Sequence, residues 1–493
     1  MDFWIAREHN YRTWLGKKGA ECRTWANTMS EIGNKLWGFA HQLRHDGIGY
    51  TDYVEQISYL LFLKIAQEKG VELPKGYDWE ALSSLSGEGL LDHYTDTIRT
   101  LGKQTGVIGS IFGEGQNRFT KPVQLKQIIG MIDEIEWTEL DIDIKGKVYE
   151  ELLERTASEG KKGAGQYFTP RPLIRAIVKC IQPDLTKTAD FKIHDPACGT
   201  GGFLLSAAEW LRIEYGAAIP REVQKRMRNG AYSGADNTPL ARRLAMMNIY
   251  LHELGGDIKL RDSLYDSDLG ERYDCVLTNP PFGVRGANQA PQRDDFTIET
   301  SNKQLNFLQH VMTILKPGGR CGIVLPDNVL FQGHAAPEVM EILTKDCNLH
   351  TVLRLPRGTF SPYSAGTKTN VFFFVKGLPT EKVWIYDGRS GIPGYTKKDR
   401  PLLETAFNEF IAAYGKNPSG TSKRAETERF RAFPIKEIAN RKYNLDIRWL
   451  KDDVENGDDE LGEPGELLEL CRADLLTATQ AIDRLTTSFS TND

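Results

Sequence analysis

The sequence predicts an α/β protein: a doubly wound sheet of seven strands, with an all-α domain before it and a helical tail after it. From about residue 24 to 157, apolar residues recur every three or four positions. From about residue 190, short apolar segments alternate with helical ones, which is typical of a parallel sheet joined by crossover helices. We expect five parts: an N-terminal extension (1–23), a helical domain (24–157), an α/β domain (158–450), an acidic linker (451–466) and a C-terminal helix (467–493).

Composition excludes several classes of protein. The 62 basic and 67 acidic side chains give a net charge of −5, so the chain as a whole is not a general polyanion binder. Its seven cysteines form no CxxC pair and no Cys/His spacing suited to zinc, so we expect no metal and a reducing, cytoplasmic location. The first twenty residues lack an apolar signal region, and no eighteen apolar residues run together. The sequence therefore predicts neither secretion nor a membrane span.

The helical domain is clearest in YVEQISYLLFLKIAQ, where Val54, Ile57, Leu61 and Ile65 fall three or four residues apart. This spacing predicts an amphipathic helix.

The α/β domain follows from seven apolar segments. We predict strands at residues 191–195, 231–236, 258–263, 273–279, 320–327, 349–356 and 370–377. Helices are predicted at 202–216, 239–254 and 306–319, the last ended by Pro317 and two glycines. In the less regular segment 382–450, residues 382–389 are a candidate for one more strand.

The last part of the chain combines charge with a heptad pattern. Residues 452–466 contain eight acids and no base, which is typical of a linker. Six apolar residues then follow at alternating steps of three and four: Leu468, Cys471, Leu475, Ala478, Ile482 and Leu485. Such a seam must be covered, either by the chain's own domain or by a helix of a partner.

Polar residues gather at the ends of the first three strands, where parallel sheets bind ligands. The first strand runs into DPACGTGG, which is neither a dinucleotide GxGxxG nor a phosphate loop ending in GK[ST]. Asp195 ahead of the glycines suits a cationic amino group, Asp236 suits the hydroxyls of a ribose, and Asp262 suits an adenine amino group. Taken singly, an acid after a strand is more often a helix cap. Together they describe S-adenosylmethionine.

The fourth strand ends in TNPPFG. Two adjacent prolines are unusual directly after a strand, and a conjugated amine as the substrate would explain them. Such an amine is a poor nucleophile because its lone pair is delocalised into the ring. If the Asn279 side-chain oxygen and the Pro280 carbonyl each accept one N–H, the nitrogen becomes more electron-rich. The prolines fix φ and remove competing donors, and Phe282 can stack on a base taken out of its duplex.

These motifs resemble a known family. NPPF after DPACGTGG is similar to the amino-methyltransferases that use S-adenosylmethionine. GAGQYFTPRPLIRAIV before the glycine loop, TSNKQLNFLQHVMTILKPGGRCGIVLPDNVLF and TKTNVFFFVKG after it look like the methylation subunit of type I restriction-modification enzymes. The resemblance extends from about residue 29 to 377, and more weakly to about 450.

The resemblance implies adenine-N6 methylation of duplex DNA by a methyltransferase domain at 158–450, with S-adenosylhomocysteine as the second product and no metal. The residues it places on the adenine are Asn279, Pro280, Pro281 and Phe282. Those it places on the cofactor are Gly165, Gln166, Tyr167, Phe168, Thr169, Pro170, Arg171, Asp195, Pro196, Ala197, Gly199, Thr200, Gly201, Gly202 and Asp236, to which the strand-end argument adds Asp262. The implied partners are a specificity subunit, with two methylation subunits for each, and a restriction subunit.

Three features depart from the family pattern: Cys198 stands where alanine is frequent, Asp236 is one methylene shorter than the glutamate of many relatives, and the extension 1–23 has no counterpart. The basic run 161–179, which contains no acid, is either a local nucleic-acid contact or a solvated face. Two other functions use the same motifs. A protein glutamine methyltransferase would act on a side-chain amide, and a non-catalytic subunit would hold the cofactor as a structural ligand.

Overall fold

The computed structural model describes residues 32–450, apart from 42, 45–46, 141, 160–167, 283–289, 331–334, 362–365 and 398. The predicted extension (1–23), linker (451–466) and C-terminal helix (467–493) therefore lie outside the described residues. The chain forms two compact units, one of residues 1–165 and 246–253, the other of residues 166–245 and 254–493. The domain boundaries drawn from the sequence stay predictions.

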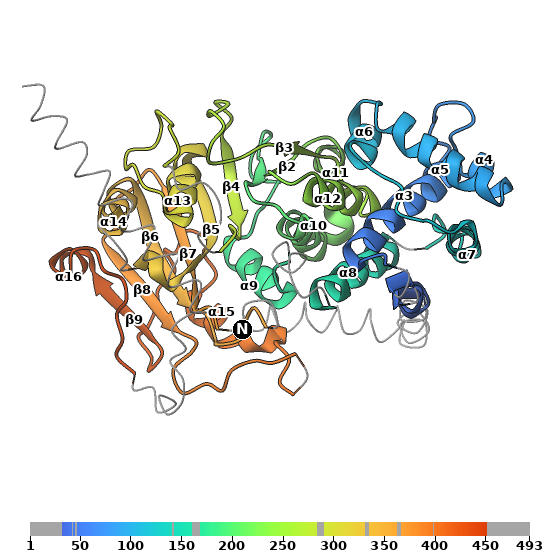
Figure 1. Ribbon diagram of the computed structural model, residues 1–493. Coiled ribbons are helices and arrows are strands. Elements are labelled where there is room, and N and C mark those ends of the chain that lie inside the picture. The colour runs from blue at the N-terminus through green and yellow to red at the C-terminus, as the bar shows by residue number, and fades with distance from the viewer. Residues whose placement is uncertain are drawn as a thin grey trace, which may run out of the picture. The chain divides into compact units, whose positions relative to one another are not determined.

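The first unit is helical, as predicted (Figure 1). Its helices are α3 (Tyr50–Glu68), α4 (Trp79–Ser84), α5 (Glu88–Leu101), α6 (Gly106–Phe112), α7 (Pro122–Asp133) and α8 (Ile142–Glu159). Helix α3 packs against α4, α6, α7 and α8, and its predicted apolar positions Val54, Ile57, Leu61 and Ile65 are all buried.

No helix in the described part of the chain is both long and apolar enough to cross a bilayer.

The second unit contains one sheet with the order β3-β2-β1-β4-β5-β7-β6-β8-β9. The strands are β1 (Ile193–Asp195), β2 (Tyr232–Asp236), β3 (Gly256–Leu260), β4 (Tyr273–Thr278), β5 (Leu315–Pro326), β6 (Cys347–Arg354), β7 (Thr369–Lys376), β8 (Lys382–Asp387) and β9 (Phe430–Pro434). All seven predicted strands are present, and the first five of them are parallel. Strand β7 is antiparallel to both β5 and β6.

The sheet is wider than predicted because two strands extend it beyond β6. The candidate at 382–389 is β8, which pairs parallel to β6, and β9 then pairs antiparallel to β8. Strand β9 was missed because its sequence, FRAFP, is short, charged and ends in proline. Those features suit a strand at the edge of a sheet.

Helices cover both faces of this sheet, and β7 shows how. Its Phe372 and Phe374 belong to a core that also contains residues of α13 (Lys303–Ile314) and α14 (Ala335–Asp346). Phe373 contacts Phe410 and Tyr414 of α15 (Asn408–Tyr414) instead. Successive side chains of a strand point to opposite faces, so these three aromatic residues anchor both layers.

The remaining helices of this unit are α9 (Arg171–Ile181), α10 (Gly202–Tyr215), α11 (Arg221–Arg228) and α16 (Ile435–Asn440), together with the first part of α12 (Pro239–Leu251), whose residues from 246 on belong to the first unit. Helix α13 is shorter than predicted, since it ends at Ile314 and β5 begins at Leu315. A proline disfavours the α conformation of the residue before it, so Pro317 already restricts the backbone at Lys316.

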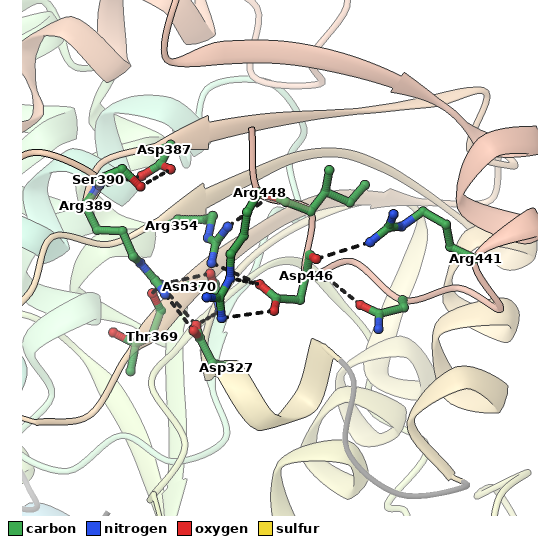
Figure 2. A network of polar contacts seen from close by, with 12 residues as sticks. Asp327, Arg354, Thr369, Asn370, Asp387, Arg389, Ser390, Arg441, Asp446 and Arg448 are labelled. Carbon is green, nitrogen blue, oxygen red and sulfur yellow. Dashed lines mark hydrogen bonds and ion pairs between the residues drawn. The ribbon is translucent and has the colours of Figure 1, made fainter. Parts of the chain in front are cut away.

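A buried polar network ties the carboxyl ends of β5, β6 and β8 together (Figure 2). Arg389 donates from its two terminal nitrogens to the two oxygens of Asp327, at 2.6 and 3.0 Å. The Asn370 side chain donates to Asp327 as well, at 2.8 Å. Arg354 donates to Asp446 at 3.0 Å and to the carbonyl of Ile447 at 3.0 Å. The segment around Asp446 is thereby fastened to the sheet.

Arg389→Met is expected to destabilise this unit by about 3–5 kcal/mol, because it leaves the Asp327 carboxylate buried without its cation. The two side chains are 4% and 13% exposed. Burial raises the pKa of Asp327, but Arg389 outweighs it and holds the pKa below its ordinary value. Urea unfolding followed by tryptophan fluorescence measures the loss.

Arg448→Met is the matched control for this prediction. Arg448 also pairs with a carboxylate, that of Asp446 at 3.2 Å, but its side chain is 58% exposed. Its replacement should cost about 1 kcal/mol or less. Equal urea midpoints for the two variants would contradict the importance of the buried pair.

Candidate active site

The strand ends surround a pocket of about 240 Å³. Its lining comes from the ends of β1 to β4, from the start of α9 and from α13. The lining residues are Phe168, Thr169, Arg171, Ile174, Asp195, Pro196, Ala197, Cys198, Gly199, Thr200, Gly202, Phe203, Asp236, Asn237, Thr238, Arg261, Asp262, Ser263, Leu264, Tyr265, Asn279, Pro281, Lys303 and Phe307.

The glycine loop after β1 needs two of its glycines for different reasons. Gly201, the N-cap of α10, has φ +79°, a left-handed conformation that favours glycine. At Gly202 the reason is space. Arg171 Nη1 donates to the Gly202 carbonyl at 2.9 Å, and a Cβ at 202 would lie 2.8 Å from that nitrogen. The loop is thus packed tightly against the start of α9.

Asp195 lies fully buried at the head of this loop. One of its oxygens accepts from the Thr278 hydroxyl at 2.6 Å and from the Ala197 N–H at 3.1 Å. Burial raises the pKa of Asp195 to about 7, even though these hydrogen bonds oppose the shift. A bound cation would favour the ionised form.

Asp236 at the end of β2 joins two loops. Its oxygens accept from the N–H groups of Gly199, at 3.1 Å, and Thr238, at 3.0 Å. Burial raises the pKa of this carboxyl group as well. The shorter aspartate is therefore held in the pocket by backbone donors on both sides.

Asp262 after β3 acts as a local cap and also lines the pocket. One oxygen accepts from the N–H groups of Leu264 and Tyr265, at 2.9 and 3.2 Å. The other accepts from the Asn237 side chain at 3.1 Å. These bonds cap a turn, because no helix lies among the described residues between β3 and β4, and the same side chain also lines the pocket.

Asn279 is the most informative residue of the site. Its side-chain nitrogen donates to the Thr169 hydroxyl at 3.0 Å. Its side-chain oxygen is buried and has no hydrogen-bond partner among the described residues. Buried acceptors are nearly always satisfied, and an unsatisfied one costs about 1–3 kcal/mol. The pocket therefore presents an acceptor that lacks a donor.

The residues after Asn279 are held from two sides. The Pro281 carbonyl accepts from the Gln304 side chain of α13 at 3.0 Å. Pro280 is buried, and the ring of Phe282 meets that of Phe360 edge to face, with centroids 5.2 Å apart. The double proline is therefore a fixed element rather than a free turn.

Most of the predicted site residues come together in this pocket. Four others, Pro170, Gly201, Pro280 and Phe282, are described but do not line it. Gly165, Gln166 and Tyr167 lie outside the described residues. The pocket also contains residues that the sequence analysis missed, including Asn237, Lys303, Phe307 and 263–265. Those at 263–265 could have been found, since they directly follow the third strand end.

The described part of the basic run, residues 168–179, makes its contacts within the protein. Arg171 lines the pocket, and Arg175 pairs with Glu209 at 3.1 Å and with Glu404 at 2.6 Å. Lys179 lies 3.8 Å from Glu404. These contacts favour a structural role for the described part of the run over a nucleic-acid contact.

Known proteins share this architecture. The model for the N-6 DNA methylase family matches residues 140–458, and that for the HsdM N-terminal domain matches residues 32–72. The StySPI methylase subunit of Salmonella potsdam, a type I restriction enzyme, is 35% identical across 93% of this chain and 95% of its own length. The EcoKI methylase subunit of Escherichia coli K12 is 34% identical, with the same coverage.

Solved structures of related proteins have the same fold. A chain from a study of complex assembly and conformational transition in the type I R-M system superposes with a TM-score of 0.76 at 28% identity, over 94% of this chain and 99% of that one. The crystal structure of the EcoKI M protein gives a TM-score of 0.52 at 31% identity, over 93% and 96%.

The fold and the strand-end pocket define an S-adenosylmethionine-dependent methyltransferase. Within that class, the chain belongs to the N-6 DNA methylase family, and its relatives are type I restriction enzyme methylase subunits.

Proposed function

We propose that this chain transfers a methyl group from S-adenosylmethionine to N6 of an adenine flipped out of duplex DNA, as the modification subunit of a type I restriction-modification complex. The observation that carries the proposal is the buried Asn279 oxygen, which lacks a donor within the described residues. An exocyclic amine supplies such a donor.

The donor set of the pocket suits S-adenosylmethionine. Asp195 would take the amino group, Asp236 the ribose hydroxyls and Asp262 the adenine amino group. The raised pKa of Asp195 supports this, because an ammonium group would restore a favourable charged state. Phe168, 6% exposed at the pocket wall, would keep water away from the cationic donor. When bound, the cofactor supplies a methyl group activated by its positive sulfur and leaves as S-adenosylhomocysteine.

Asn279 and Pro280 would act on the adenine amine. The Asn279 side-chain oxygen and the Pro280 carbonyl each accept one of its hydrogens, which localises the lone pair on nitrogen and aims it along the path of transfer. As the N–C bond forms, the amine becomes acidic, and one proton passes from it to solvent. No strong general base is required of the chain.

Phe282 would hold the adenine ring once it has left the helix stack. Enzymes that modify a base commonly extrude it and stack it on an aromatic side chain. Phe360, only 3% exposed, contacts Phe282 edge-on and would keep that ring from turning away.

The assembly we propose has two copies of this chain with one specificity subunit, together with a restriction subunit. Three observations support it. Related chains are named as type I restriction enzyme methylase subunits. The net charge of −5 suits a chain that borrows its DNA-reading surface. The heptad seam at 467–493, outside the described residues, would dock on a partner helix.

The test is plasmid methylation with and without a co-expressed specificity subunit, using tritiated cofactor and mapping the methylated bases. We expect label in N6-methyladenine at defined sites, and only when both subunits are present. Label in protein would favour a glutamine methyltransferase instead. A complex that binds cofactor and DNA but never labels adenine would favour a non-catalytic role.

A further inference from the structure

We propose that Gln304 is a positioning residue, which aims the Phe282 ring at the flipped base by fixing the backbone between the double proline and Phe282. This inference rests on the proposed function, in which Phe282 stacks on the base. Gln304 does not line the pocket, so it would act through the Pro281 carbonyl rather than by touching the substrate.

The backbone after β4 has little freedom until it reaches Pro281. The pyrrolidine rings fix φ at Pro280 and Pro281. A residue that precedes a proline is held in the extended region, which restricts ψ at Asn279 and Pro280. The first torsion that neither rule restricts is ψ of Pro281. This torsion sets the direction in which the chain enters Phe282.

Gln304 supplies the missing restraint on this torsion. Its side-chain nitrogen donates to the Pro281 carbonyl at 3.0 Å. A carbonyl oxygen can only accept, so the contact requires the nitrogen end of the amide. Holding that oxygen also holds the peptide plane between Pro281 and Phe282, because the oxygen lies in the plane. Pro281 is itself exposed, so side-chain packing contributes little to fixing the plane.

Gln304 belongs to a firmly anchored part of the fold. It is buried in the first turn of α13. The Asn302 side chain caps this helix by accepting from the Leu305 N–H at 3.1 Å, and Leu305 lies in the same core as residues of β5 and β7. Phe282 is thus held in two ways, through its backbone by Gln304 and through its ring by Phe360.

The experiment is a double-mutant cycle in the complete complex with its specificity subunit. Gln304→Met keeps the length of the side chain but loses the donor, and Phe282→Ala removes the ring. We expect Gln304→Met to lower the single-turnover rate about fivefold, and Phe282→Ala to lower it about 10–100-fold. The double variant should stay within about twofold of Phe282→Ala, because Gln304 acts only through that ring. The affinity for S-adenosylhomocysteine should change by less than about twofold in all three variants.

Gln309→Met is the matched control, because Gln309 is also a buried amide on α13. Its side chain bonds to the N–H and the carbonyl of Ile298, at 2.8 and 2.9 Å, and lies outside the pocket. Its loss should lower thermal stability but leave the rate within about twofold of the wild type. Gln304→Glu, whose carboxylate has the same shape but cannot donate, replaces a Gln304→Met variant that thermal unfolding shows to be unfolded.

Fluorescence gives a second readout that needs no methyl transfer. 2-Aminopurine replaces the adenine at a mapped target site, and its emission depends on whether the base is stacked. With S-adenosylhomocysteine bound, Gln304→Met and Phe282→Ala should both shift this emission from the wild-type value in the same direction. The double variant should match Phe282→Ala.

Three outcomes would overturn the proposal: an unchanged rate in Gln304→Met, additive losses of rate in the double variant, or a Gln304→Met emission equal to that of the wild type. If the wild-type complex leaves adenine unmethylated while the emission follows the expected relation, the proposed function fails and the role of Gln304 stands.

Discussion

Replacing Asn279 with alanine is expected to lower the single-turnover rate of methyl transfer by about 10²–10³-fold, while the affinity for S-adenosylhomocysteine stays within about threefold. The loss is large because, in the proposed mechanism, the buried side-chain oxygen acts on the amine as charge develops on nitrogen. The binding change is small because the proposed cofactor contacts come from other strand ends. Radiolabel transfer to duplex DNA and titration calorimetry measure the two effects separately.

Asn408→Ala is the control for this substitution, since Asn408 is exposed at the start of α15 and outside the pocket. It should leave both quantities at their wild-type values. A strong loss of cofactor affinity in Asn279→Ala would show that the division of the pocket into a cofactor side and a substrate side is wrong.

Cofactor affinity is expected to fall as the pH drops from about 8 to about 6, approaching tenfold per pH unit at the acid end. The sign follows from Asp195. Burial raises its pKa to about 7, so below that value a proton must leave before a cationic amino group can bind. Above it the carboxylate is already ionised and the affinity should level off. Calorimetry across this range in buffers of different ionisation enthalpy would also detect the proton released.

Asp195→Asn should bind the cofactor more weakly and without this pH dependence. Its counterpart is Asp274→Asn, on β4 but outside the pocket, where Asp274 pairs with Lys316 at 2.8 Å. That variant should retain the wild-type profile. A flat profile in the unmodified protein would remove Asp195 from the binding site.

The α/β pattern could be predicted because a strand buried on both faces has a run of apolar residues, as in NVFFFVKG of β7. The direction of β7 could not be predicted in this way. Whether a strand runs parallel or antiparallel depends on which strands it joins, and β7 inserts between β5 and β6. Strand β3 begins at Gly256, two residues before the predicted start, because backbone pairing with Tyr232 begins at a glycine that has no apolar side chain.

Site residues could be predicted where a polar side chain lies at the end of a strand. Asp195, Asp236, Asp262 and Asn279 all line one pocket, as their positions after strands imply. Their supporting contacts were not predictable. Thr278 donates to Asp195 from 83 residues away, and such a pair is created only by the pairing of β1 with β4.

Similarly, Gln304 reaches the Pro281 carbonyl from a different helix. Its polar side chain is only 2% exposed, so it lies within the fold although the sequence marks it simply as a polar position in a helix.

The unsatisfied oxygen of Asn279 also bears on when the reaction stops. If the Asn279 oxygen and the Pro280 carbonyl accept as proposed, an unmodified amine brings two hydrogens to two acceptors, whereas its methylated form brings one. One acceptor would then again lack a donor. The same pair of oxygens that prepares a base for modification thus holds the finished base less well, so each adenine should leave with a single methyl group.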